Sequence, residues 1–114
     1  MNIGIDMMGG DFAPLEAVKG IQLYLSKAQQ NLFCIGDATQ LEGLFQQHGI
    51  ASPFLHIIDA PEVIGYHEHP TKALKEKPNS SISIGFKLLA TGEIDAFLSA
   101  GNTGAMLVGA MFSI

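Results

Sequence analysis

Small polar residues and glycines lie together in residues 99–105, and their chemistry suits the binding of an anion. The apolar run 94–98 before them predicts a buried strand, and the run 105–112 after them predicts a helix. A turn of this kind leaves backbone N–H groups at the positive end of a helix dipole, where they attract phosphate. An ordinary strand-to-helix turn capped by Thr103 is the alternative interpretation. The residues expected to hold the anion are Ser99, Gly101, Asn102, Thr103 and Gly104.

A second glycine turn, at residues 6–14, follows the strand-like residues 2–6. Gly9 and Gly10 permit a tight turn and close backbone approach, and Asp6 and Asp11 place two carboxylates beside it. These carboxylates suit the orientation of a hydroxyl, a water or a lysine, or the binding of a metal. Alternatively, Asp11 caps the following helix and Asp6 is a hydrogen-bond partner at the strand end. Neither G-x-G-x-x-G nor Gly-Lys-Ser/Thr is present, so these residues do not predict a standard nucleotide site.

A third group of polar residues spans positions 70–81, where Lys72, Lys75 and Lys77 form a basic patch in an acidic chain. Ser80 and Ser81 follow at the start of a predicted helix. The patch suits an anionic substrate or an acidic partner. The alternative is a solvated turn in which Asn79 or Ser80 caps the helix.

Two histidines, His67 and His69, flank Glu68 just before Pro70, but no third metal ligand is evident nearby. We therefore expect a surface loop here and no metal site. No cofactor is expected either.

Strand-like and helix-like segments alternate along the chain, which predicts an α/β fold with a mainly parallel sheet covered by helices on both faces. Strands are expected at residues 2–6, 31–36, 54–59 and 94–98, and helices at residues 14–30, 38–48, 80–91 and from about 103 onward. Residues 60–79 contain three prolines and are expected to be irregular. Ligands of such sheets bind at the carboxyl ends of strands, so residues 6–14 and 99–105 should share a functional edge.

Composition narrows the class of protein further. The 114 residues suit one small domain, and 47% hydrophobic residues provide a core. The net charge of −5 argues against nucleic-acid binding. The single cysteine, Cys34, excludes an internal disulfide, fits a reducing compartment and is expected in the core. Residues 105–114 are apolar almost all round, which predicts burial within a longer polypeptide; a membrane anchor is the alternative.

Three blocks of this sequence resemble the phosphate acyltransferases of bacterial phospholipid synthesis, the acyl-ACP:phosphate transacylases. The blocks are Asp6-x-Met8-Gly9-Gly10-Asp11-x-x-Pro14, Pro70-x-x-Ala73-Leu74-Lys75-x-Lys77-x-x-Ser80-Ser81, and residues 99–105. Their order and spacing agree with the family, and so does Gly36-Asp37. The family often has arginine at the position of Lys75, and lysine keeps the charge without the planar fork.

The resemblance implies that residues 1–114 are the N-terminal part of a single phosphate acyltransferase domain. The implied fold is an α/β/α sandwich like that of isopropylmalate dehydrogenases and phosphotransacetylases, incomplete at its C-terminus. The implied reaction is reversible transfer of a long-chain acyl group from acyl carrier protein to inorganic phosphate, giving acyl phosphate for phospholipid synthesis. A homodimer in the cytoplasm is also implied, with peripheral membrane contact through regions outside these residues. A non-catalytic anion-binding module and an interaction domain are the alternative functions.

Overall fold

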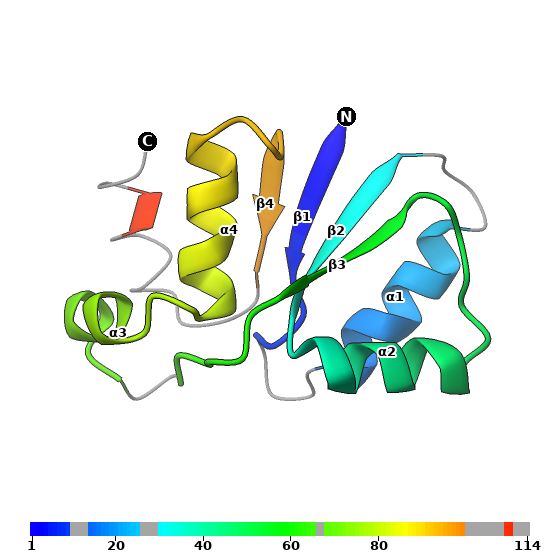
Figure 1. Ribbon diagram of the computed structural model, residues 1–114, viewed down its shortest axis with the longest axis horizontal. Coiled ribbons are helices and arrows are strands. Elements are labelled where there is room, and N and C mark those ends of the chain that lie inside the picture. Colours follow the sequence, from blue (N-terminus) through cyan, green and yellow to red (C-terminus); the bar gives the residue numbers. More distant parts are fainter. Residues whose placement is uncertain (10–13, 26–29, 66–67, 100–108, 111–114) are drawn as a thin grey trace.

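The computed structural model describes residues 1–9, 14–25, 30–65, 68–99 and 109–110 of the chain. Strands and helices alternate in the described residues, as the sequence predicts (Figure 1). In chain order the elements are β1 (Asn2–Asp6), α1 (Leu15–Leu25), β2 (Asn31–Gly36), α2 (Ala38–Gln47), β3 (Leu55–Asp59), α3 (Pro70–Glu76), α4 (Ser81–Ala90) and β4 (Ala96–Leu98).

The four strands form one parallel sheet in the order β3-β2-β1-β4. The chain moves outward from β1 to β2 and β3, and then crosses back to add β4 on the other side of β1. The direction of strand addition therefore reverses between β1 and β4. In parallel α/β sheets this reversal opens a crevice at the carboxyl ends of the two strands, where ligands bind.

Helices cover both faces of the sheet, which confirms the predicted α/β fold (Figure 1). The first hydrophobic cluster joins α1 and α2 to β1 and β2, and it includes Val18, Leu41 and the buried Cys34. The second joins α4 to β4 on the other face, where the rings of Phe86 and Phe97 meet edge to face at 5.3 Å. Burial raises the pKa of the Cys34 thiol to about 12, so this residue is an inert part of the core.

Most predicted boundaries agree with the structure to within one or two residues. Gly49 and Gly92 follow the ends of α2 and α4 with φ angles of 65° and 78°, the left-handed conformation expected of a helix-ending glycine. The last strand begins two residues later than predicted. The N–H of Ile94 bonds to the carbonyl of Leu88 at the end of α4, so this residue belongs to the helix-to-strand connection.

The prediction that residues 60–79 are irregular is wrong for α3. Pro70 occupies the first turn of this helix, where a missing N–H costs no hydrogen bond. The Nδ1 atom of His69 accepts from the N–H of Lys72 at 3.4 Å and caps the helix. Pro78 follows Lys77, the C-cap residue of the helix. Pro70 and Pro78, which suggested an irregular stretch, instead lie at the two ends of a short helix.

Two sequence-based expectations fall wholly or partly outside the described residues. The final helix expected from about residue 103 is described only at Gly109 and Ala110, which are helical. Gly109 packs closely on the ring of Phe86, where an added Cβ would lie 2.5 Å from Cδ2. The predicted helix at residues 14–30 is described from Leu15 to Leu25.

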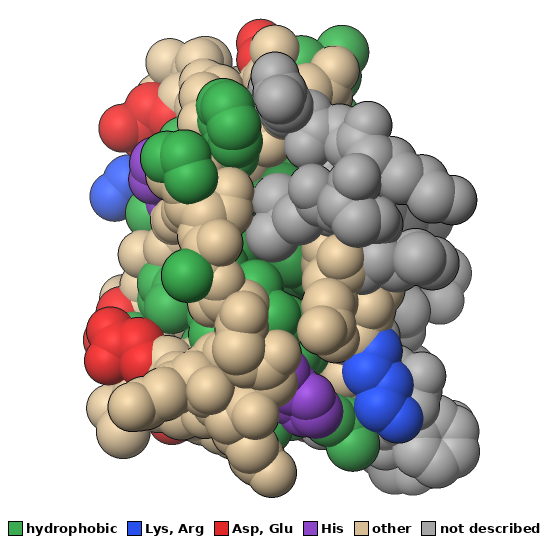
Figure 2. All heavy atoms as spheres, turned by 90° about the vertical axis from the view of Figure 1, so that its right-hand side faces the viewer, with side chains coloured by type: hydrophobic (Ala, Val, Ile, Leu, Met, Phe, Trp, Pro, Cys, Tyr) green, Lys and Arg blue, Asp and Glu red, His purple; other side chains and the backbone are tan. Residues whose placement is uncertain are grey.

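The face in Figure 2 exposes several acidic side chains and few basic ones, in line with the net charge of −5. In the described part of the chain, no helix has both the length and the apolar character needed to cross a membrane.

Gly85 is the position where α4 approaches the sheet too closely for any side chain. A Cβ at this position would overlap the ring of Phe97, whereas a Cβ at Gly43 in α2 would meet no atom within 4 Å. We expect Gly85→Ala to lower the free energy of unfolding by about 1–3 kcal/mol through overpacking. Gly43→Ala should raise it by about 0.5–1 kcal/mol through helix propensity. Urea unfolding of both variants checks this, and a stabilised Gly85→Ala protein would contradict the packing.

Candidate functional site

The ends of β1 and β4 bring two sequence-predicted segments together at one edge of the sheet. Ile5 and Leu98 are register partners in the parallel pairing, so Asp6 and Ser99 follow side by side at the carboxyl edge. The Oγ of Ser99 donates to Oδ2 of Asp6 at 2.7 Å. This confirms that the segments after Ile5 and Leu98 share an edge, at the reversal point of the sheet.

Asp6 is the centre of this edge, because its carboxylate accepts hydrogen bonds from three segments of the chain. Oδ1 accepts from the Oγ of Ser81 at 2.5 Å and from the N–H of Met8 at 3.0 Å, and Oδ2 accepts from Ser99. Only 4% of Asp6 is exposed. No lysine or histidine of the described residues pairs with it.

The start of α4 reaches the same point through a cap of serine side chains. Ser80 is fully buried and caps the helix, since its Oγ accepts from the N–H of Ser83 at 3.2 Å. Ser80 donates to the Oγ of Ser83 at 3.0 Å, and Ser83 donates to the carbonyl of Lys77 at 3.1 Å. Of the two caps that the sequence allows, Asn79 and Ser80, the structure has Ser80. This cap directs the positive end of α4 and the side chain of Ser81 toward Asp6.

The turn after β1 is anchored in the core. Met7 is fully buried in the first hydrophobic cluster, and its N–H donates to the carbonyl of Ile35 at 2.9 Å. Met8 packs against Gly36, and the half-buried Gly9 follows it. The sequence did not predict this role for Met7, because an apolar residue beside a glycine turn can equally contact a ligand.

The lysine patch separates into two different environments. The Nζ of Lys77 donates to the carbonyl of Val63 and to Oε2 of Glu68, both at 2.8 Å, so its charge is paired within this connection. Lys75 is exposed on α3, and none of its described contacts reaches Asp6, Ser81 or Ser99. Ser81 therefore reaches Asp6 at the edge, Ser80 caps α4, and Lys77 stabilises a neighbouring connection.

The remaining predicted site residues lie outside the described part of the chain and stay predictions. They are Gly10, Asp11, Gly101, Asn102, Thr103 and Gly104. His67 lies outside it as well, while Glu68 and His69 have the structural partners given above. The described residues contain no group of three His, Cys, Asp or Glu side chains arranged for a metal.

Two further aspartates line the same edge of the sheet. Asp37, after β2, caps α2 by accepting from the N–H of Gln40 at 3.1 Å. Asp59, at the end of β3, accepts from the N–H of Ala38 at 3.1 Å. Both carboxylates hold helix-start N–H groups, whereas Asp6 holds hydroxyl groups from distant segments.

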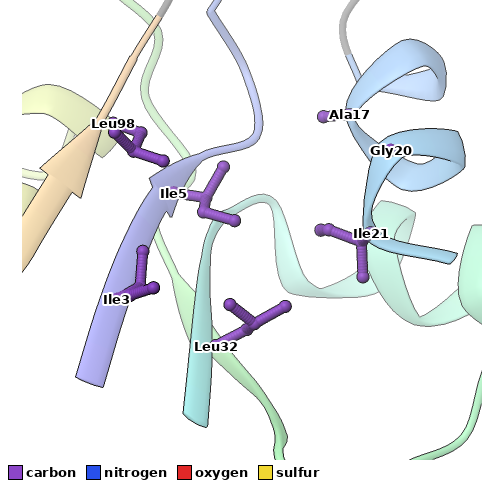
Figure 3. A pocket seen from close by; sticks show the side chains of 7 residues that line it. All are labelled: Ile3, Ile5, Ala17, Gly20, Ile21, Leu32 and Leu98. Atoms are coloured by element: carbon purple, nitrogen blue, oxygen red, sulfur yellow. The ribbon is translucent and has the colours of Figure 1, made fainter. Parts of the chain in front are cut away.

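An apolar pocket of about 220 Å³ adjoins the strand residues that precede Asp6 and Ser99. In Figure 3 the side chains of Ile5 and Leu98 face the same space as Ala17 and Ile21 of α1. Leu98 is 56% exposed at this edge strand. The pocket gives the polar edge an apolar neighbour on the α1 face; its lining consists of Ile3, Ile5, Ala17, Gly20, Ile21, Leu32 and Leu98.

Comparison with known proteins gives consistent matches along the chain. The profile of a family described as "Fatty acid synthesis protein" matches residues 1–114. The chain is 42% identical over 114 residues to the phosphate acyltransferase of Pelotomaculum thermopropionicum, covering 100% of this chain and 33% of that protein. It is 40% identical to the phosphate acyltransferase of Dictyoglomus thermophilum over 111 residues, which cover 97% of this chain and 33% of that protein.

A third phosphate acyltransferase, from Caldanaerobacter subterraneus, is 45% identical over 112 residues, which cover 97% of this chain and 32% of that protein. The chain therefore spans about a third of the length of the curated relatives it matches.

The hydrogen bond from Ser81 to Asp6 should contribute more to stability than the bonds of Ser83 on the same helix. Ser81 bonds to a buried charge, whereas Ser83 bonds to neutral oxygens. We expect Ser81→Ala to cost about 1.5–3 kcal/mol and Ser83→Ala about 0.5–1.5 kcal/mol. Urea unfolding of the two variants measures the difference, and equal costs would count against a charged acceptor.

The Lys77–Glu68 pair should make stability depend on pH in the acid range. The hydrogen bond from Lys77, followed by that from the Gly65 N–H, lowers the pKa of Glu68. Because the pKa of Glu68 is lower in the folded protein than in the unfolded chain, the pair stabilises the fold at pH values above the ordinary carboxyl pKa. This stabilisation is lost as the pH falls through the pKa of the folded protein.

The difference in Tm between the native protein and Glu68→Gln should therefore be positive at pH 7 and shrink below about pH 4. Glu42→Gln, the same replacement at an exposed position of α2, is the control. A pH-independent difference for Glu68→Gln would contradict the role of its charge.

Proposed function

The chain belongs to the family of fatty acid synthesis proteins, and from this premise we propose that it is part of a phosphate acyltransferase. The proposed reaction is reversible transfer of a long-chain acyl group from acyl carrier protein to inorganic phosphate. Its product, acyl phosphate, supplies phospholipid synthesis. The relatives named phosphate acyltransferase support the acyltransferase class.

The observation that carries this proposal is the meeting of three family-like blocks at one point of the fold. Residues 6–9 and Ser99 come together through the Asp6 carboxylate at the sheet edge where ligands of parallel α/β folds bind. The third block joins them through Ser81. Three segments separated in sequence thus converge on one place, as a substrate site assembled from several loops requires.

In the proposed chemistry a phosphate oxygen attacks the thioester carbonyl carbon. A carbon–oxygen bond forms, the carbon–sulfur bond breaks, and the carrier leaves as a thiol after taking up a proton. Phosphate is itself the nucleophile, so the protein needs to position two substrates and stabilise the developing oxyanion. The buried Cys34, with a pKa raised to about 12, fits a reaction without an acyl-cysteine step.

Partners and location form part of the same proposal. Acyl carrier protein is the acyl donor, and a second copy of the protein completes a homodimer. We place the enzyme in the cytoplasm with peripheral membrane contact outside residues 1–114. The exposed Lys72 and Lys75 of α3 offer positive charge to an acidic carrier, although Lys72 also lies 3.9 Å from Glu76.

The test is acyl phosphate formation by the full-length protein from acyl-acyl carrier protein and inorganic phosphate. Mass spectrometry should detect acyl phosphate and free carrier thiol in equal amounts, and neither product should form when phosphate is omitted. Phosphate binding without turnover would instead indicate an anion-binding module. Absence of both binding and turnover, with self-association in light scattering, would indicate an interaction domain.

A further inference from the structure

Every described residue that lines the apolar pocket beside α1 is a glycine or carries an aliphatic side chain. A sugar, a nucleotide or another polar ligand therefore meets no side-chain hydrogen-bond partner among these residues, and its burial there would be costly. A hydrocarbon, in contrast, gains free energy in proportion to the apolar area that it buries. The lining of this pocket therefore suits an aliphatic chain.

The pocket lies between the sheet and one side of α1. Ile3 and Ile5 are two positions apart on β1, so their side chains face the same side of the sheet and are spaced about 7 Å along the strand. Ala17 and Ile21 are about one helical turn apart on α1 and face them across the same space (Figure 3). The pocket thus extends along β1, with the sheet on one side and the helix on the other.

One end of the pocket adjoins the candidate site and is accessible from solvent. Ile5 and Leu98 are register partners that line the pocket, and Asp6 and Ser99 directly follow them at the carboxyl edge. Leu98 is 56% exposed, and Gly20 of α1, which also lines the pocket, is exposed as well. A chain whose polar head lies at the carboxyl edge can therefore enter the pocket beside these residues.

The volume of the pocket sets how much of an acyl chain it can hold. A methylene group occupies about as much space as a water molecule in the liquid, about 30 Å³. A pocket of about 220 Å³ therefore holds about seven methylene groups, which is part of a long-chain acyl group.

We propose that this pocket binds the part of the acyl chain next to the thioester, with the carbonyl at the carboxyl edge and the following methylene groups along β1. The inference rests on the proposed function, because it takes a long-chain acyl group as the substrate. The pocket is a binding subsite in which no bond forms or breaks. Each methylene group buried in it should improve affinity by about fourfold.

A cysteine placed in the pocket reports directly on the occupant. The side chain of Ala17 faces the pocket (Figure 3), and cysteine at this position adds only one sulfur atom. Cys34 does not interfere, because it is fully buried and its pKa is raised to about 12.

The experiment measures the rate at which a maleimide labels Ala17→Cys in the full-length protein without phosphate, with peptide mass spectrometry to assign the label. Palmitoyl-acyl carrier protein at about ten times its Kd should slow labelling about tenfold, because the reagent reacts only with the free protein. Carrier protein without an acyl chain should not slow it, which distinguishes the acyl chain from the carrier.

Ala90→Cys is the matched control, since it makes the same replacement at the exposed end of α4 on the other face of the sheet. Neither form of the carrier should change its labelling. Protection of Ala17→Cys that is absent, that unacylated carrier gives equally, or that Ala90→Cys shares would overturn the proposal. A thiol at position 17 that is unreactive in the free full-length protein would also overturn it, since another segment or a second copy would then fill the pocket.

Filling the pocket from α1 gives an independent test that does not depend on Ala17→Cys. A Cβ at Gly20 or at Gly43 meets no atom within 4 Å, and of the two only Gly20 lines the pocket. Gly20→Leu should raise the KM for palmitoyl-acyl carrier protein about fourfold or more, the effect of one displaced methylene group. Gly43→Leu should leave KM and kcat unchanged. An unchanged KM in folded Gly20→Leu would overturn the proposal.

Turnover by the native protein separates failure of the subsite from failure of the proposed function. If acyl phosphate forms but Ala17→Cys is not protected, the proposed function stands and the acyl subsite is overturned. Protection by palmitoyl-acyl carrier protein without acyl phosphate formation supports the acyl subsite and counts against the proposed function.

Discussion

The hydrogen-bonded carboxylate of Asp6 is the constraint on which the rest of this structure depends. An ionised carboxylate that is only 4% exposed is costly unless its oxygens are satisfied. Its donors come from the turn after β1, the start of α4 and the end of β4. Satisfying one charge therefore fixes the relative position of three segments. Because these segments also carry the family-like blocks, the same constraint that stabilises the fold assembles the candidate site.

The two faces of the sheet make different contributions to that assembly. On one face α1 and α2 build the first hydrophobic cluster, which buries Met7 and so holds the turn that follows Asp6. On the other face α4 packs on Phe97 through the space that Gly85 leaves, and this close packing sets where Ser81 meets the carboxylate. Apolar packing thus brings the polar groups into range, and hydrogen bonds then fix their orientation.

The family gives this edge a chemical context, and the residues within it have unequal roles. Ser81 and Ser99 bond to the Asp6 carboxylate and Ser80 caps α4. Lys77, which has the residue type expected of an anion ligand, binds Glu68 and the Val63 carbonyl. A lysine that is close in sequence to a site therefore need not bind the ligand of that site. The acyltransferase proposal depends on the convergence of segments, and its electrostatics are dominated by a negative group whose hydrogen bonds orient its neighbours.

The sequence by itself determined the parallel α/β class, the strands at residues 2–6 and 31–36, a helix cap at Asn79 or Ser80, and the burial of Cys34. These features follow from apolar periodicity and from residues a few positions apart, which act within one element. Only the tertiary structure decided that Asp6 bonds to Ser81 and Ser99, which lie 75 and 93 positions away. The strand order β3-β2-β1-β4 makes those contacts, and periodicity carries no information about strand order. Helix α3 was missed for a related reason: its prolines stop a helix or start one depending on which turn they occupy.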